Sequence, residues 1–149
     1  MLSLKQLIVG AALLAAQGVL GEGIHLFNCR PYGAAGSERS WLSIVAYCAN
    51  DADCSALGYT LPGNDVCVVS KSSTAESYHI WEGGQQSCTF PSSGVTFTWN
   101  IPANAQSQPN YSSVGSGSNG YRSFAGYKDN KVSGASYNYH SCEKIYYYV

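Results

Sequence analysis

Three histidines are the first candidates for chemistry in this chain, because histidine is the side chain that titrates nearest neutral pH. They are His25, His79 and His140. None belongs to a local catalytic or zinc motif, since the sequence has no G-x-S-x-G elbow, no C-x-x-C pair and no H-E-x-x-H segment. A zinc site would have to be assembled across the fold. We therefore expect no cofactor and no metal, and we favour a protein that is not an enzyme.

The cysteines suit disulfide bonds better than metal binding, because they follow an apolar N-terminal segment typical of exported chains. They are Cys29, Cys48, Cys54, Cys67, Cys88 and Cys142. Six thiols allow many pairings, and the sequence does not decide among them. We favour Cys29 with Cys142 and Cys67 with Cys88, since bridges across long loops restrict the unfolded chain most. A Cys48–Cys54 bridge would close only a small loop.

Residues 1–21 have the features of a secretory signal peptide. Lys5 is their only charged residue, and the uncharged run over residues 7–16 is followed by small residues. That run is shorter than the roughly 20 residues needed to span a bilayer. The sequence predicts cleavage before Glu22, a single secreted, extracellular domain over residues 22–149, and glycosylation at Asn110, which lies in the only N-x-S/T sequon.

Composition and charge argue against nucleic acid and membranes as partners. The chain has 8 basic residues, one of them in the leader, against 9 acidic residues, so no basic face for phosphates is expected. No stretch after the leader is long and apolar enough to span a membrane. Tyrosine, with 12 copies, is the commonest large residue. It suits a binding face, but packing across the strands of a small β protein is the favoured explanation.

Segments rich in β-branched and aromatic residues, separated by Gly, Pro, Ser and Asn clusters, predict a mainly β fold. The predicted strands cover residues 24–29, 41–48, 66–69, 94–101, 121–127, 131–139 and 145–149. The segment 41–48 also fits a short helix capped by Ser40, although a strand is favoured. Alternate apolar residues between 95 and 101 share one face, which we expect in the core. The expected fold is a compact, disulfide-stapled antiparallel sheet or sandwich, mainly β or α+β with one short helix.

An almost uncharged segment over residues 102–120 is too long for a hairpin turn. Loops longer than about 12–15 residues are usually functional or disordered. We therefore predict a mobile contact loop over residues 106–120. The predicted binding residues are Tyr111 and Asn119 in this loop and Tyr121 and Arg122 beneath it. We also expect His140 beneath the loop, while a simple spacer loop remains the alternative.

Residues 129–134, DNKVSG, resemble the calcium-binding motif of βγ-crystallin-like domains. In that motif two acidic or amide residues precede a hydrophobic residue and two hydroxyl residues. Only two residues separate an aromatic-x-Gly element, residues 124–126, from Asp129, fewer than the family's Greek key requires. We interpret residues 128–130 as a hairpin turn between two strands, without a metal.

Several residues, in order along the chain, resemble those of secreted fungal ribonucleases of the T1 type: Tyr78, His79, Thr98, Trp99, Arg122 and His140. The resemblance implies a ribonuclease-like fold, with His79, Arg122 and His140 as catalytic residues if the protein is active. Thr98 replaces the family's catalytic glutamate, and an alcohol cannot act as the general base. A degenerate, inactive member is therefore favoured over an active one.

The segments HLFNC, WEGGQQSCTF and VTFTWNI are similar in style to small, secreted, cysteine-rich fungal proteins of the effector type. This resemblance implies a protein that binds a host or extracellular protein or glycan, with a role in virulence. A carbohydrate-binding module is a further hypothesis, which an exposed Trp41, Trp81 or Tyr111 would favour.

Overall fold

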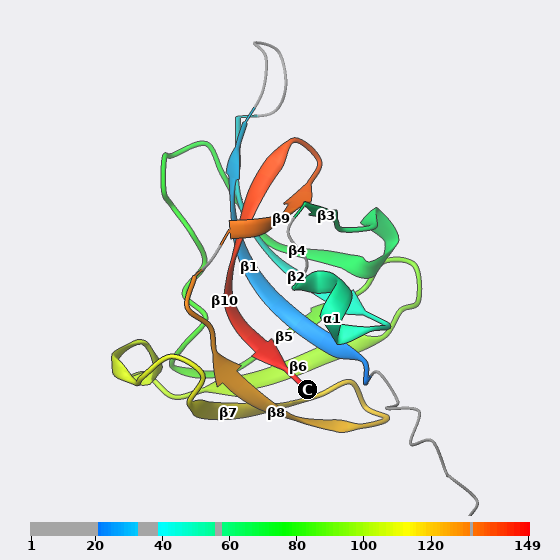
Figure 1. Ribbon diagram of the computed structural model, residues 1–149, viewed down its shortest axis with the longest axis vertical. Helices are drawn as coiled ribbons and strands as arrows, with labels where there is room; N and C mark the ends of the chain where they lie inside the picture. Colours follow the sequence, from blue (N-terminus) through cyan, green and yellow to red (C-terminus); the bar gives the residue numbers. More distant parts are fainter. Residues whose placement is uncertain (1–20, 33–38, 56–57, 132) are drawn as a thin grey trace, which may run out of the picture.

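The computed structural model describes residues 21–32, 39–55, 58–131 and 133–149 (Figure 1). In this part of the chain ten strands form one sheet, in the order β4-β2-β1-β10-β8-β7-β6-β5, with β9 beside β10 and β3 beside β9. The strands are β1 (Gly23–Pro31), β2 (Trp41–Cys48), β3 (Tyr59–Thr60), β4 (Val66–Ser72), β5 (Gly84–Thr89), β6 (Thr96–Ile101), β7 (Ser113–Ser118), β8 (Ser123–Lys128), β9 (Ser133–Tyr137) and β10 (His140–Tyr148).

The described helices are all very short: α1 (Asp51–Cys54), η1 (Gly63–Asp65) and η2 (Ala105–Ser107). None of them is long or apolar enough to cross a bilayer. Among the strands of the described residues, every pair is antiparallel except β3 with β9. The prediction of a mainly β, antiparallel, disulfide-stapled fold is therefore confirmed. The predicted leader, apart from Gly21, lies outside the described residues.

The sheet curves into a nearly closed barrel. Its edge strands, β4 and β5, share no strand pairing, but the Cys67–Cys88 disulfide joins them. The interior is filled mainly by large apolar and aromatic side chains: Ile24, Leu26, Val45, Trp81, Phe90, Phe97, Trp99, Ile101, Val114, Phe124, Ile145, Tyr146 and Tyr148. Phe97, Trp99 and Ile101 are at most 1% exposed, which confirms the core face predicted for this strand.

A second core lies outside the barrel, where α1, β3 and β9 cover part of β1, β2 and β10 (Figure 1). β1 contributes to both cores because successive side chains of a strand point to opposite faces. Ile24 and Leu26 point into the barrel, whereas Phe27 and Cys29 pack in the outer core. β1 is therefore buried on both of its faces, and it is paired along both edges, with β2 and with β10.

The C-terminal strand β10 lies between β1 and β8 rather than at an edge. Its last residues pair with β8 and its first residues with β9, so β8 and β9 follow one another along the same side of β10. The predicted hairpin turn at residues 128–130 is therefore wrong. The hairpin is instead formed by β9 with β10, while β8 pairs with β7 and with the end of β10. The β8–β10 pairing passes over β9 in the sequence and is therefore not visible from neighbouring segments.

The predicted contact loop over residues 106–120 is also wrong as a continuous loop, because residues 113–118 form β7. β7 has the sequence SVGSGS, which lacks the usual signs of a strand. Glycine is required here by packing: a Cβ on Gly117 would come within 2.4 Å of the Phe97 ring. The absence of a side chain thus lets β7 cross close to the aromatic core.

Three disulfides join the six cysteines, and the favoured pairings are confirmed. Cys29–Cys142 joins residues directly opposite each other in β1 and β10. The three bridges have sequence separations of 113, 21 and 6 for Cys29–Cys142, Cys67–Cys88 and Cys48–Cys54. On chain entropy alone they contribute about 5, 3 and 2 kcal/mol to stability, respectively.

Replacing Cys67 and Cys88 together by alanine is expected to lower the free energy of unfolding by about 3 kcal/mol. Because this bridge joins strands that do not pair, its loss should also speed amide hydrogen exchange in β4 and β5. The matched control is the Cys48→Ala/Cys54→Ala variant, which leaves the junction between β4 and β5 intact. Equal exchange in β4 and β5 of both variants would contradict this role of the bridge.

Trp99→Ala is expected to lower the free energy of unfolding by about 3–5 kcal/mol, measured by urea denaturation. The indole is 1% exposed, and its Nε1 donates a hydrogen bond to the Trp81 carbonyl oxygen at 3.3 Å. Ile80→Ala serves as the control, because Ile80 is 72% exposed and its loss should change stability by less than about 0.5 kcal/mol.

Candidate functional site

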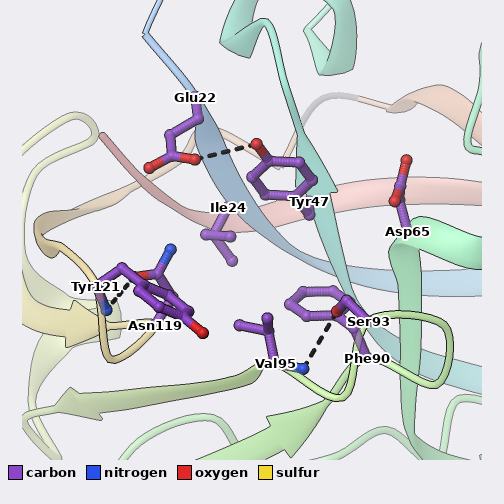
Figure 2. Close-up of a pocket in the computed structure, with 9 residues that line it drawn as sticks. All are labelled: Glu22, Ile24, Tyr47, Asp65, Phe90, Ser93, Val95, Asn119 and Tyr121. Carbon is purple, nitrogen blue, oxygen red and sulfur yellow. Dashed lines mark hydrogen bonds between the residues drawn. The ribbon is translucent and has the colours of Figure 1, made fainter.

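One end of the barrel is hollowed into a cavity of about 210 Å³ (Figure 2). Its lining comes from β1 and the residue before it, from β2 and η1, and from the β5–β6 and β7–β8 connections. The lining residues are Glu22, Ile24, Tyr47, Asp65, Phe90, Ser93, Val95, Asn119 and Tyr121. We call this cavity the end pocket. Mouths of β-barrels are common places for ligands, and this volume suits a small group such as one side chain or one sugar unit.

The turn between β7 and β8 holds one wall of the end pocket in place. The Asn119 side-chain oxygen accepts hydrogen bonds from the backbone N–H groups of Tyr121 and Arg122, at 3.0 and 2.8 Å. Gly120, which lies between Asn119 and Tyr121, has a φ of 86°, a value that glycine adopts without strain. The turn thereby fixes the backbone of Tyr121, a residue that is 87% exposed.

Two carboxylates give the end pocket a negative character. Glu22 accepts a hydrogen bond from the Tyr47 hydroxyl at 3.0 Å, and its other oxygen lies 3.6 Å from Nη1 of Arg122. Burial and the bond to Glu22 raise the pKa of Tyr47, so this hydroxyl remains a donor at neutral pH. Asp65 is the second carboxylate in the lining.

The floor of the end pocket is apolar and aromatic. Ile24 and Val95 lie between the rings of Phe90 and Tyr121 in Figure 2. An apolar floor beneath acidic groups fits a ligand with an aliphatic stem and a cationic or hydroxyl-bearing head. Arg122 already approaches Glu22 loosely, as a side chain 47% exposed, so a cationic ligand would compete with it for the same carboxylate.

The structure brings three of the four predicted binding residues together. Asn119 and Tyr121 line the end pocket, and Arg122 pairs with Glu22 of the lining. Tyr111 lies apart from them, in the lining of a second cavity of about 280 Å³ beside Asp129 and Lys144. Asn110, the predicted glycosylation site, is exposed in the segment before β7.

In the segment that resembles a crystallin-type calcium motif, the acidic residue forms an ion pair with a lysine. The buried Asp129 carboxylate accepts a hydrogen bond from the Asn130 N–H at 2.7 Å and lies 3.4 Å from Nζ of Lys144. The positive charge beside this carboxylate is therefore supplied by the protein itself. Val132, a further residue of the motif, lies outside the described residues.

The structure does not bring the ribonuclease-type residues together. Arg122 lies beside Glu22, just before the start of β1, whereas His140 pairs with Pro31 at the end of β1. A strand of this length separates its ends by roughly 30 Å. His140 is 2% exposed, and its ring nitrogens lie 2.7 Å from the carbonyl oxygens of Ser40 and Asn138.

His79 also has a structural environment. Its backbone N–H donates to the Ser43 hydroxyl at 2.9 Å, and its ring contacts Gln86 and lies nearly perpendicular to the ring of Trp81. Trp81 is 2% exposed and donates to Asn28 at 3.1 Å, so it forms no platform for a sugar. Trp41 is half-buried against Tyr78, and of the three proposed platforms only Tyr111 is exposed.

Sequence reasoning missed Glu22, Tyr47 and Asp65 as lining residues, because only the curvature of the sheet brings them to one end. One signal was available: Asn119-Gly120 is a strong hairpin pair and marks the β7–β8 turn. No family model, curated protein or solved structure matches this chain.

We expect the purified protein to leave RNA uncleaved, because Arg122 and His140 are at opposite ends of β1. The measurement is incubation with guanosine-containing RNA, with a T1-type ribonuclease as the positive control. Guanosine-terminated fragments that form with this protein, and disappear in both the His79→Gln and His140→Gln variants, would contradict the expectation.

Proposed function

We propose that this protein is a secreted binding protein of the effector type, whose end pocket takes a basic side chain of an extracellular or host protein. The end pocket is the observation that carries the proposal. It combines two carboxylates, an apolar floor and an exposed tyrosine whose backbone is held by Asn119. A protein with this role needs no catalytic group, and His79 and His140 are engaged in structural contacts.

The chemistry of the lining favours a lysine or arginine side chain. Its aliphatic stem would pack on Ile24 and Phe90, and its charged head would reach Glu22 and Asp65. Tyrosine rings also attract cations through their negative faces, and Tyr121 offers such a ring. Arg122 is itself a basic side chain near the Glu22 carboxylate, and this contact supports a basic ligand at the same place.

Two further observations support an extracellular role. The three disulfides are of the kind that persist in oxidising compartments. The apolar leader supplies the export signal. A role in virulence belongs to the same proposal and depends on the partner.

A glycan is the second candidate ligand, because Tyr121 is exposed enough to stack against a sugar ring and Asn119 lies beside it. The two ligands differ in charge. Arg122 competes with a cationic head for Glu22, but it does not compete in this way with a neutral sugar.

The test uses capped tripeptides with a central lysine or arginine, compared with the neutral analogues norleucine and citrulline. We expect the charged peptides alone to shift the amide resonances of residues 119–122 on titration. Glu22→Gln and Tyr121→Ala should each weaken binding about tenfold, the equivalent of 1.4 kcal/mol. Arg122→Gln should strengthen it, because it frees the Glu22 carboxylate.

Tyr139→Ala is the matched control, since Tyr139 is 69% exposed and lies in the β9–β10 turn. Its binding should equal that of the unmodified protein. Equal shifts with charged and neutral peptides would refute the basic-side-chain proposal. Shifts of the same amides with neutral methyl glycosides, unchanged in Arg122→Gln, would favour the glycan instead.

A further inference from the structure

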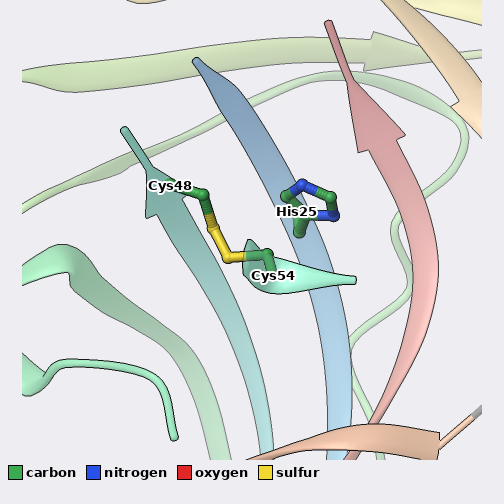
Figure 3. A group of neighbouring side chains, drawn as sticks. All are labelled: His25, Cys48 and Cys54. Atoms are coloured by element: carbon green, nitrogen blue, oxygen red, sulfur yellow. A yellow bond between two sulfur atoms is a disulfide. The ribbon is translucent and has the colours of Figure 1, made fainter. Parts of the chain in front are cut away.

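A cluster of three metal-binding residue types lies in the outer core, away from the end pocket (Figure 3). Cys48 ends β2, Cys54 ends α1, and His25 of β1 lies beside them. A ring nitrogen of His25 and both sulfur atoms lie within 4.8 Å of one another. All three residues are buried, and the two cysteines are joined as a disulfide.

His25 has an unusual hydrogen-bonding environment for a buried histidine. Its Nε2 lies 2.7 Å from the Asp51 carboxylate, whereas its Nδ1 is buried without a hydrogen-bond partner. In the tautomer that donates from Nε2 to Asp51, Nδ1 keeps a free lone pair.

The position of the Asp51 carboxylate beside His25 is set by α1 and Gly23. Asp51 opens α1, and a Cβ on Gly23 would come within 2.2 Å of its Oδ1. A glycine at this position therefore leaves the space that the carboxylate occupies. A carboxylate that holds one nitrogen of a histidine, while the other faces a metal, is the common second layer of zinc sites.

We propose that Cys48, Cys54 and His25 form a zinc site when the Cys48–Cys54 disulfide is reduced, with Asp51 orienting the histidine. Two thiolates and one imidazole are ligands that zinc prefers, and a water molecule can complete a tetrahedral set. The buried, unpartnered Nδ1 would gain a partner in this state. The site is independent of the end pocket and of the proposed binding function.

The reaction balances with a phosphine as the reductant. The phosphine takes the oxygen of one water molecule and becomes a phosphine oxide, while the two electrons it gives up break the sulfur–sulfur bond. The two protons of the water complete the Cys48 and Cys54 thiols. Binding of Zn²⁺ then releases these two protons to solvent, because zinc binds thiolates.

The site has a route to solvent. The cavity of about 280 Å³ beside β9 and β10 is lined by Cys54, Phe27 and Lys144. It reaches Cys54 from the outside, so a small reductant and a metal ion have a way in. The remaining bridges close much longer loops and hold the strands together without Cys48–Cys54.

The experiment treats the full disulfide-bonded protein with graded amounts of a water-soluble phosphine, then with Zn²⁺ or, as a spectroscopic probe, Co²⁺. We expect one metal per chain, a thiolate-to-cobalt charge-transfer band, and protection of Cys48 and Cys54 from alkylation, mapped by mass spectrometry. The other four cysteines should remain disulfide-bonded at the lowest phosphine concentration that opens the small loop.

Three variants test the individual roles. Cys48→Ser/Cys54→Ser should bind no metal, and His25→Gln should bind it much more weakly than the unmodified chain. Asp51→Asn should weaken zinc affinity about 10- to 100-fold while keeping the thiolate-to-cobalt band. His79→Gln is the control and should bind as the unmodified protein does.

Metal retention no greater than in Cys48→Ser/Cys54→Ser, or unchanged affinity in His25→Gln, would overturn the proposal. Near-ultraviolet circular dichroism reports the fold throughout. A reduced chain that loses this signal and does not recover it with Zn²⁺ would also overturn the proposal, since a formed site stabilises the fold that contains it.

Discussion

The structure depends on β1 being buried on both faces. Its alternate side chains supply the interior of the barrel and the outer core, and its pairing with β10 is locked by Cys29–Cys142. A one-residue shift of β1 would exchange the two sets of side chains and place His25 inside the barrel. The register between β1 and β10 is thus the constraint from which the positions of both cores follow.

The positions of both candidate sites depend on β1. Glu22 directly precedes β1 and faces the end pocket, while His25 on the opposite face meets α1 and the Cys48–Cys54 bridge. The two sites therefore lie near the same end of β1 but in separate environments. One is a solvent-facing cavity with exposed charges, and the other is a buried cluster in which every polar atom needs a partner.

Local patterns predicted the strands where alternation was strong and failed where it was weak. The segment at 94–101 was recognisable because its apolar residues alternate, and its buried face was identified correctly. β7 was not, because SVGSGS carries almost no hydrophobic signal and is a strand only through its partners β6 and β8. The pairing of β8 with β10 was similarly hidden, since β9 lies between these two strands in the sequence.

The sequence alone determined that this is a mainly β chain with an even set of cysteines, no local catalytic motif and few charges, because composition and periodicity are properties of neighbouring residues. Only the tertiary structure decided which residues meet. Sheet curvature collects Glu22, Asp65 and Tyr121 around one cavity and separates Arg122 from His140 by the length of β1. Such encounters depend on long-range strand pairing, which leaves no trace in residue spacing.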